Sequence, residues 1–149
     1  MKALVRRKWD QRDKDLLVAK LTEFLSRKES VLFAYLHGSF LKEKFFRDVD
    51  VAVYLDSKHF KDAGHMFDYC LSLAAECDLT IPGNPIDIKF LNATPLPFRF
   101  EVVTRGQLLF TRDEEAHIDF VVRTRSLYFD FLPHLKFYFQ AIVLEKHND

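Results

Sequence analysis

The sequence predicts an α/β domain in which a small mixed β-sheet is flanked by helices. Apolar residues at helical spacing alternate along the chain with short apolar runs rich in Val, Ile, Tyr and Phe. No repeat, linker or low-complexity segment interrupts this alternation, and 149 residues are enough for one core. We therefore expect residues 1–149 to form a single domain.

The elements are expected in the order helix, strand, strand, helix, strand, helix, strand, helix. The helix N-cap residues are expected at Asp13 and Asp113, and Pro133 is expected to kink the last helix. Residues 40–46 fit either a helical turn or a loop. The expected elements are a helix over 13–28, strands over 31–37 and 48–56, a helix over 58–76, a strand over 85–91, a short helix from Pro97 to Gly106, a strand over 107–112 and a helical tract over about 113–146.

The charge balance argues against a general polyanion binder. Lys plus Arg and Asp plus Glu each number 22, so there is no strong nucleic-acid signal. Basic residues do outnumber acidic ones over residues 1–28, and we interpret that stretch as a solvated helix face. No apolar stretch approaches a membrane span, and no signal peptide is recognisable. Cys70 and Cys77 share one expected helix, too far apart for a disulfide, so we expect buried thiols in the cytoplasm.

Two aspartates lie at the start of the second expected strand, in the stretch HGSFLKEKFFRDVDVAVYL. Side chains at i and i+2 of a strand point to one face, so Asp48 and Asp50 project together. Two ionised carboxylates in a partly dry place repel each other. Either one takes up a proton or a cation lies between them, and oxygen ligands favour a hard cation such as Mg²⁺.

A third carboxylate and a Gly-Ser pair complete a candidate phosphoryl-transfer site. Asp87 lies in the apolar run PIDIKFL, where an unpaired charge is costly, and its strand would neighbour that of Asp50. Three carboxylates can hold two Mg²⁺ ions, which clamp the attacking and leaving oxygens of a phosphoryl displacement. Gly38 lets backbone N–H groups approach a phosphate, and Ser39 adds a hydroxyl donor.

This ordered set resembles the minimal nucleotidyltransferases of the polymerase-beta superfamily, the antitoxins encoded beside HEPN-domain toxins. The resemblance runs through LHGSF, DVDVAVYL and IDIKFL, and extends to RGQLLFTRDEE and LYFDFLPHLKFYF. It implies a polymerase-beta-like fold and transfer of AMP from ATP, with two Mg²⁺ ions, to a tyrosine of a HEPN RNase toxin. It also implies that Gly38 and Ser39 hold the triphosphate.

By the same resemblance Asp48 and Asp50 would bind both metal ions, and Asp87 would bind one and help to activate the acceptor hydroxyl. The spacer FLKEKFFR departs from the family pattern because it lacks a glycine. Two other functions stay open: a non-catalytic antitoxin that blocks its toxin by binding, and a nucleotidyltransferase acting on a small molecule or RNA.

Three further residues near the motif have two readings each. Arg47 either contacts a phosphate or forms a surface ion pair. Lys89, two residues after Asp87, either reaches the triphosphate or pairs with the aspartates. His37 is either a neighbour of the nucleotide or a structural histidine that ends a strand.

The tract over about 113–146 is the expected interaction surface. Between Phe120 and Leu144 apolar residues occupy nearly all sides of the expected helix, whereas an ordinary surface helix keeps a polar back. One side would pack on the sheet. The other side would be covered by a second protein, either another copy of this chain in a homo-oligomer or a toxin. The remaining reading is a helix that is wholly internal.

Overall fold

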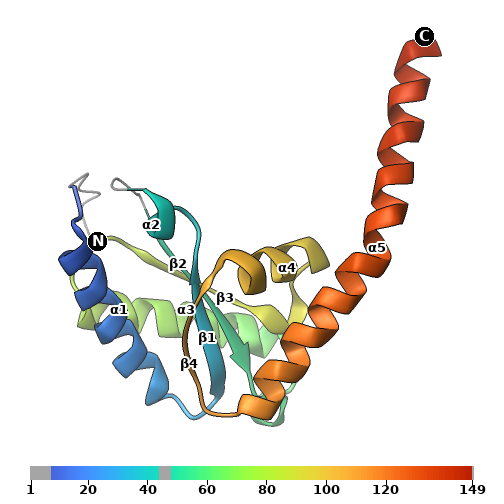
Figure 1. Ribbon diagram of the computed structural model, residues 1–149. Coiled ribbons are helices and arrows are strands. Elements are labelled where there is room, and N and C mark those ends of the chain that lie inside the picture. The colour runs from blue at the N-terminus through green and yellow to red at the C-terminus, as the bar shows by residue number, and fades with distance from the viewer. Residues whose placement is uncertain (1–7, 44–47, 149) are drawn as a thin grey trace.

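The computed structural model describes residues 8–43 and 48–148 and shows one four-stranded sheet with helices on both faces (Figure 1). The predicted mixed α/β fold and its order of major elements are confirmed. The elements are α1 (Gln11–Ser26), β1 (Val31–His37), α2 (Ser39–Lys42), β2 (Val49–Leu55), the 3-10 turn η1 (Ser57–His59), α3 (Ala63–Thr80), β3 (Ile86–Phe90), the 3-10 turn η2 (Leu91–Ala93), α4 (Leu96–Arg105), β4 (Gln107–Thr111) and α5 (Glu114–Asn148).

The strands lie in the order β3-β2-β1-β4, and the sheet is mixed. β1 pairs antiparallel with both β2 and β4, whereas β2 and β3 run parallel because α3 carries the chain back between them. This parallel pair brings the starts of β2 and β3 together at one end of the sheet. The carboxylate positions of both strands lie near that end.

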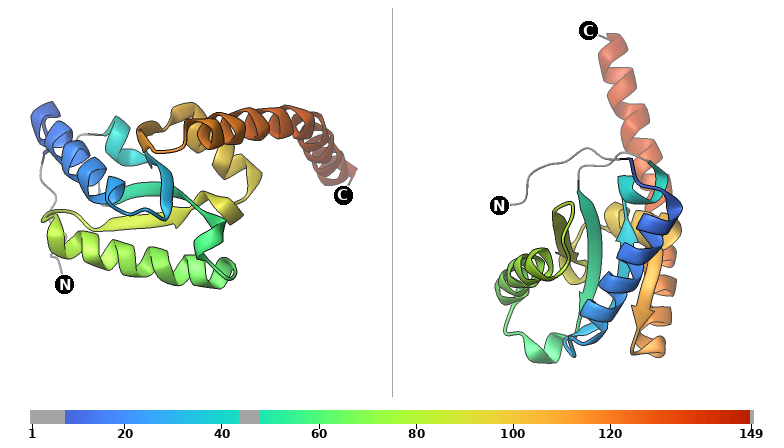
Figure 2. Two further views of the ribbon diagram at one scale, coloured as in Figure 1. Left: turned by 90° about the horizontal axis from the view of Figure 1, so that it is seen from below. Right: turned by 90° about the vertical axis from the view of Figure 1, so that its left-hand side faces the viewer.

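Each face of the sheet carries its own apolar core. α3 and α5 lie on opposite sides of the sheet (Figure 2), and the core residues divide accordingly. The core shared with α1 and α3 includes Leu21, Leu25, Leu36, Val51, Val53, Cys70, Leu73 and Ile88. The second core, beneath α4 and the start of α5, consists of Phe33, Tyr35, Ala52, Leu91, Val102 and Val103.

α1 begins earlier than the sequence indicated. Asp10 is the N-cap: its carboxylate accepts a hydrogen bond from the Asp13 backbone N–H at 2.8 Å. Asp13, the predicted cap, completes the capping box by accepting from the Asp10 N–H at 3.3 Å. Both residues are good caps, and the reciprocal pair fixes the start three residues before the predicted one.

α3 starts later than predicted, and only one of its apolar sides is buried. It starts at Ala63, capped by Asp62, and not at residue 58, because residues 57–59 form η1. Phe67 and Leu71, which recur at helical spacing, are exposed. The buried residues are Met66, Cys70, Leu73 and Cys77. Helical spacing fits both sets, and packing against β3 decides between them. Both cysteines are free and buried, as predicted.

α5 is one continuous helix with Pro133 inside it, and it changes direction partway along (Figure 1). Its first turns pack on the sheet, where the Tyr35 hydroxyl and His117 Nε2 share a hydrogen bond of 2.5 Å and Phe120 lies 5.4 Å from Phe33 between ring centroids. Its far half projects away from the body of the molecule (Figure 1). The large apolar side chains exposed beyond residue 126 are Leu127, Phe129, Phe131, Phe137, Tyr138, Phe139, Val143 and Leu144, which we call the α5 apolar surface.

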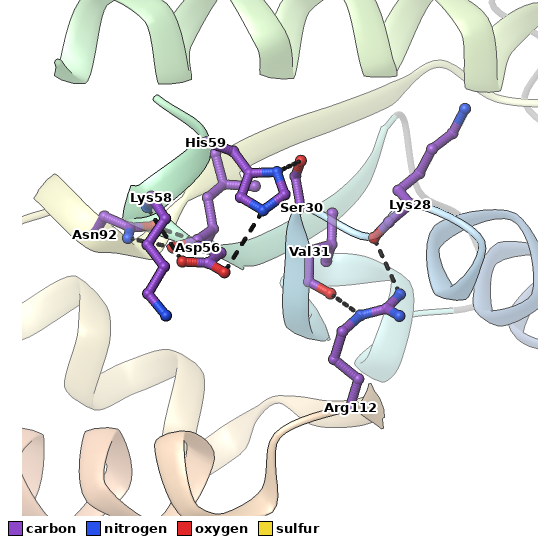
Figure 3. A network of polar contacts seen from close by, with 9 residues as sticks. Lys28, Ser30, Val31, Asp56, Lys58, His59, Asn92 and Arg112 are labelled. Atoms are coloured by element: carbon purple, nitrogen blue, oxygen red, sulfur yellow. Dashed lines mark hydrogen bonds and ion pairs between the residues drawn. The ribbon is translucent and has the colours of Figure 1, made fainter. Parts of the chain in front are cut away.

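A polar network stabilises the end of the sheet that lies opposite to the aspartates (Figure 3). Arg112, which follows β4, donates from Nε to the Val31 carbonyl at 2.6 Å and from Nη2 to the Lys28 carbonyl at 3.0 Å. Nearby, the Ser30 hydroxyl lies 3.2 Å from His59 Nδ1, but the Asp56 carboxylate is 3.7 Å from Nε2, beyond hydrogen-bond range. The network closes turns and anchors the start of α5. Across the described ranges, none of the helices has the length and apolar character needed to cross a membrane.

Candidate active site

Carboxylates from two parallel strands meet on the face of the sheet that carries α4 and α5. Asp50 lies in β2 directly opposite Asp87 of β3, and paired residues of neighbouring strands share a face. Asp48 precedes β2 by one residue and lies close enough to influence the charge of Asp50. The three carboxyl groups that the sequence indicated therefore lie near one end of the sheet, and their metal-binding role stays a prediction.

Burial and like charge act together on Asp50. Burial, followed by the nearby charge of Asp87 and then that of Asp48, raises the pKa of the Asp50 carboxyl, while Lys89 opposes the rise. An ionised Asp50 is therefore destabilised in the absence of a cation. This is the electrostatic condition that favours either a bound proton or a bound metal ion.

The carboxylates have the right donor chemistry for Mg²⁺, which takes oxygen ligands. Within residues 8–43 and 48–148, no three His, Cys, Asp or Glu side chains are gathered closely enough to hold a metal ion. Asp87 Oδ2 instead lies 3.9 Å from Lys89 Nζ. Lys89 therefore forms an ion pair with an aspartate, which is one of its two interpretations from the sequence. The acidic groups suit a divalent cation because they are oxygen ligands, lie on one face of the sheet and repel one another. Within the described residues they do not form a preformed three-ligand cluster.

The absence of a side chain at Gly38 leaves room for the carboxylate of Asp50. Its φ is +80°, a conformation that side chains disfavour, and an added Cβ would lie 2.5 Å from Asp50 Oδ2. The sequence indicated this glycine as a phosphate contact. The structure adds a second requirement, since any larger residue would push away the carboxylate.

Replacing Gly38 with alanine is expected to reduce both stability and activity. The positive φ alone should cost about 1–3 kcal/mol of unfolding free energy, and the new methyl group should displace the Asp50 carboxylate. Urea unfolding and nucleotidyl-transfer assays would measure the two effects. Gly64→Ala, within α3, is the matched control and should leave activity unchanged; equal behaviour of the two variants would contradict the assigned role of Gly38.

The turn after Gly38 is held from α1. Ser39 starts the four-residue helix α2, and the buried ring of Phe40 anchors it in the core. Lys14 Nζ donates to the carbonyl of Phe40 and, at 2.7 Å, to that of Glu43. These contacts fix the start of the spacer between the Gly-Ser pair and the aspartates. Arg47, the candidate phosphate contact at its end, lies outside the described residues.

His37 is the last residue of β1 and lies on this face of the sheet. It is paired in register with Asp50, and its ring meets that of Phe98 from α4 edge-on at 5.3 Å. Burial, and then Lys89, lowers the pKa of the His37 imidazole, against the raising effect of Asp87. Sequence reasoning missed Phe98 and Lys14, because neither belongs to a motif; Phe98 reaches the site only through the packing of α4.

The fold and these residues define a class of protein: a Gly-Ser turn followed by acidic residues on two parallel strands of a small mixed sheet is the arrangement of a nucleotidyltransferase. The chain belongs to the family described as Polymerase beta, Nucleotidyltransferase, whose model matches residues 19–115. No protein of curated function matches the chain by sequence.

Solved structures share the fold over most of the chain. A chain of the complex between the tri-AMPylated Shewanella oneidensis HEPN toxin and its MNT antitoxin is 23% identical, with a TM-score of 0.58, covering 89% of this chain and 97% of that one. A chain of the MntA–HepT toxin–antitoxin complex is 23% identical, with a TM-score of 0.57 over 88% and 97% of the two chains. A chain of a toxin–antitoxin structure with AMP-PNP is 24% identical, with a TM-score of 0.59 over 86% and 96%.

Proposed function

We propose that this nucleotidyltransferase is the antitoxin of a two-protein module and transfers AMP from ATP to a tyrosine of a partner HEPN RNase toxin in the cytoplasm. The observation that carries the proposal is the register pairing of Asp50 with Asp87 beside Gly38. It is supported by the similarity of the fold to chains from toxin–antitoxin complexes, one of which contains an AMPylated toxin. An ATP analogue is present in another similar structure.

In the proposed mechanism, Asp48, Asp50 and Asp87 would hold two Mg²⁺ ions, and the bound ions would neutralise phosphate charge and lower the pKa of the acceptor hydroxyl. Gly38, Ser39, Arg47 and Lys89 orient the triphosphate. Asp87 receives the proton of the acceptor hydroxyl. The hydroxyl oxygen forms a bond to the α-phosphorus, the bond from the α-phosphorus to the bridging oxygen breaks, and pyrophosphate leaves with the displaced electron pair.

The test is direct transfer between purified proteins. The chain is mixed with its HEPN toxin, Mg²⁺ and ATP labelled on the α-phosphate. Mass spectrometry then measures the intact mass of the toxin. We expect the toxin to gain the mass of AMP on a tyrosine and to lose its RNase activity. Label on added RNA or a small molecule, with none on the toxin, would contradict the proposed acceptor.

A second function, neutralisation by binding alone, is favoured by the α5 apolar surface and by the lack of a preformed three-ligand cluster within the described ranges. A variant with Asp48→Asn and Asp50→Asn separates the two functions. If catalysis neutralises the toxin, cells that carry the variant and the toxin should stop growing. Growth equal to that of cells with the unsubstituted chain would establish neutralisation by binding.

A further inference from the structure

His37 has a buried nitrogen that is unpaired within the described part of the chain. Its Nε2 has no hydrogen-bond partner there, although solvent barely reaches it. Buried polar atoms are nearly always paired, because an unmade hydrogen bond leaves the cost of desolvation uncompensated. A polar atom that persists unpaired in a site is therefore a position at which a ligand atom is expected.

The surroundings of His37 specify the kind of ligand. His37 ends β1 next to Gly38 and opposite Asp50, so its ring shares a face with the acidic groups. Phe98 holds the ring edge-on and also lies beneath the ammonium group of Lys89, 5.4 Å from the ring centroid. Phe98 thus contacts both the imidazole of His37 and the ammonium group of Lys89, next to the carboxylates.

A group bound at this border is expected to be anionic and rich in acceptor oxygens. Lys89 supplies positive charge and N–H donors, and an imidazole Nε2–H supplies one more donor in a partly dry place. The phosphates of a nucleotide have these properties, and in the proposed reaction they lie between the carboxylate-bound cations and the neighbouring donors. An acceptor hydroxyl brings no charge for Lys89 to complement.

We propose that His37 is a nucleotide-contacting residue whose Nε2 donates a hydrogen bond to a phosphate oxygen, with Phe98 fixing the orientation of the ring. This inference rests on the function proposed above and adds a substrate contact to it. The competing explanation is that His37 only fills space against Phe98.

The variant His37→Phe separates these explanations, because phenylalanine keeps an aromatic ring against Phe98 and removes the nitrogen. We expect its melting temperature to equal or exceed that of the unsubstituted protein, since an unpaired buried polar atom is lost. We expect the KM for ATP to rise about tenfold, as for loss of one hydrogen bond to a charged group, with the KM for the protein acceptor unchanged. His37→Gln, which offers a side-chain N–H at a similar reach, should recover part of the affinity.

A second measurement needs no substitution. Adding AMP-PNP with Mg²⁺ to the ¹⁵N-labelled protein should shift the His37 Nε2 resonance, whereas Mg²⁺ alone should shift it less. This inference would be overturned by an unchanged KM for ATP in His37→Phe, or by an Nε2 resonance that does not shift when the nucleotide is added. Either result would leave the proposed function intact. Failure of the unsubstituted protein to bind nucleotide would overturn both.

Discussion

Asp50→Asn is expected to lose at least roughly a hundredfold in nucleotidyl transfer and yet to unfold at a higher temperature than the unsubstituted protein. Asparagine offers a neutral ligand in place of the carboxylate beside Asp48 and Asp87, so we expect the proposed metal site to bind divalent cations less well. The same replacement removes a charge that burial and two neighbouring carboxylates disfavour. Transfer assays and thermal melts in EDTA would measure both effects.

The sign of the stability change follows from the pKa of Asp50, which is raised in the folded protein. The folded chain binds the Asp50 proton more tightly than the unfolded chain does. The free energy of unfolding therefore decreases as pH rises from the ordinary aspartate pKa through the raised one, and the loss is complete above the raised pKa. Asparagine abolishes this loss, so the gain in melting temperature should disappear in acid below the ordinary pKa.

Asp68→Asn is the matched control for Asp50→Asn. It makes the same chemical change at an exposed position on α3, which covers the opposite face of the sheet from the strand carboxylates, and should alter neither transfer nor melting. Addition of Mg²⁺ and nucleotide should raise the melting temperature of the unsubstituted protein more than that of Asp50→Asn. Full activity of Asp50→Asn would remove this residue from the mechanism.

Placing charges on the α5 apolar surface is expected to weaken binding of the proposed HEPN toxin partner. Phe137 is 75% exposed and Leu144 is 64% exposed, and the two lie seven residues apart on one side of the helix. A buried interface anchor contributes about 2 kcal/mol or more, so Phe137→Glu with Leu144→Glu should weaken binding of the HEPN toxin on the order of a thousandfold. Titration calorimetry with the purified toxin would measure the loss.

Leu79→Glu provides the control for this double variant, because Leu79 is 90% exposed on α3, away from α5. It should leave toxin binding unchanged. Light scattering of the chain alone tests the homo-oligomer that the sequence also suggested: a monomer at micromolar concentration would leave the toxin as the occupant of this surface. Unweakened toxin binding by the double variant would show that the α5 apolar surface is not the interface.

The sequence alone was sufficient for the strands and for grouping Asp48 with Asp50. A period of two fixes which strand side chains share a face, so Asp48 and Asp50 were assigned together without knowledge of the partner strands. The parallel register that sets Asp87 directly opposite Asp50 depends on how α3 returns the chain, and no local pattern encodes it. The same holds for Phe98, which reaches His37 only once α4 has packed on the sheet.

Local patterns were insufficient where one pattern allowed two tertiary outcomes. In α3, apolar residues occupy two sides, and only contact with β3 buries the side containing Cys70 and Leu73 and leaves Phe67 exposed. At the start of α1, Asp10 and Asp13 are both suitable caps, and the structure uses them as a reciprocal pair. For Gly38 the residue was identified correctly, but its steric relation to Asp50 required the folded arrangement.

The continuity of α5 has a geometric consequence for any protein held at its far end. The first turns of the helix are fixed to β1, the strand that ends at His37, and the same helix runs on without a break to the projecting end. Each residue of a helix adds about 1.5 Å of length and about 100° of rotation. The number of residues in α5 therefore sets both the separation and the rotational phase at which a bound protein meets the carboxylates, and inserting or deleting a few of them would turn a different side of that protein toward the site.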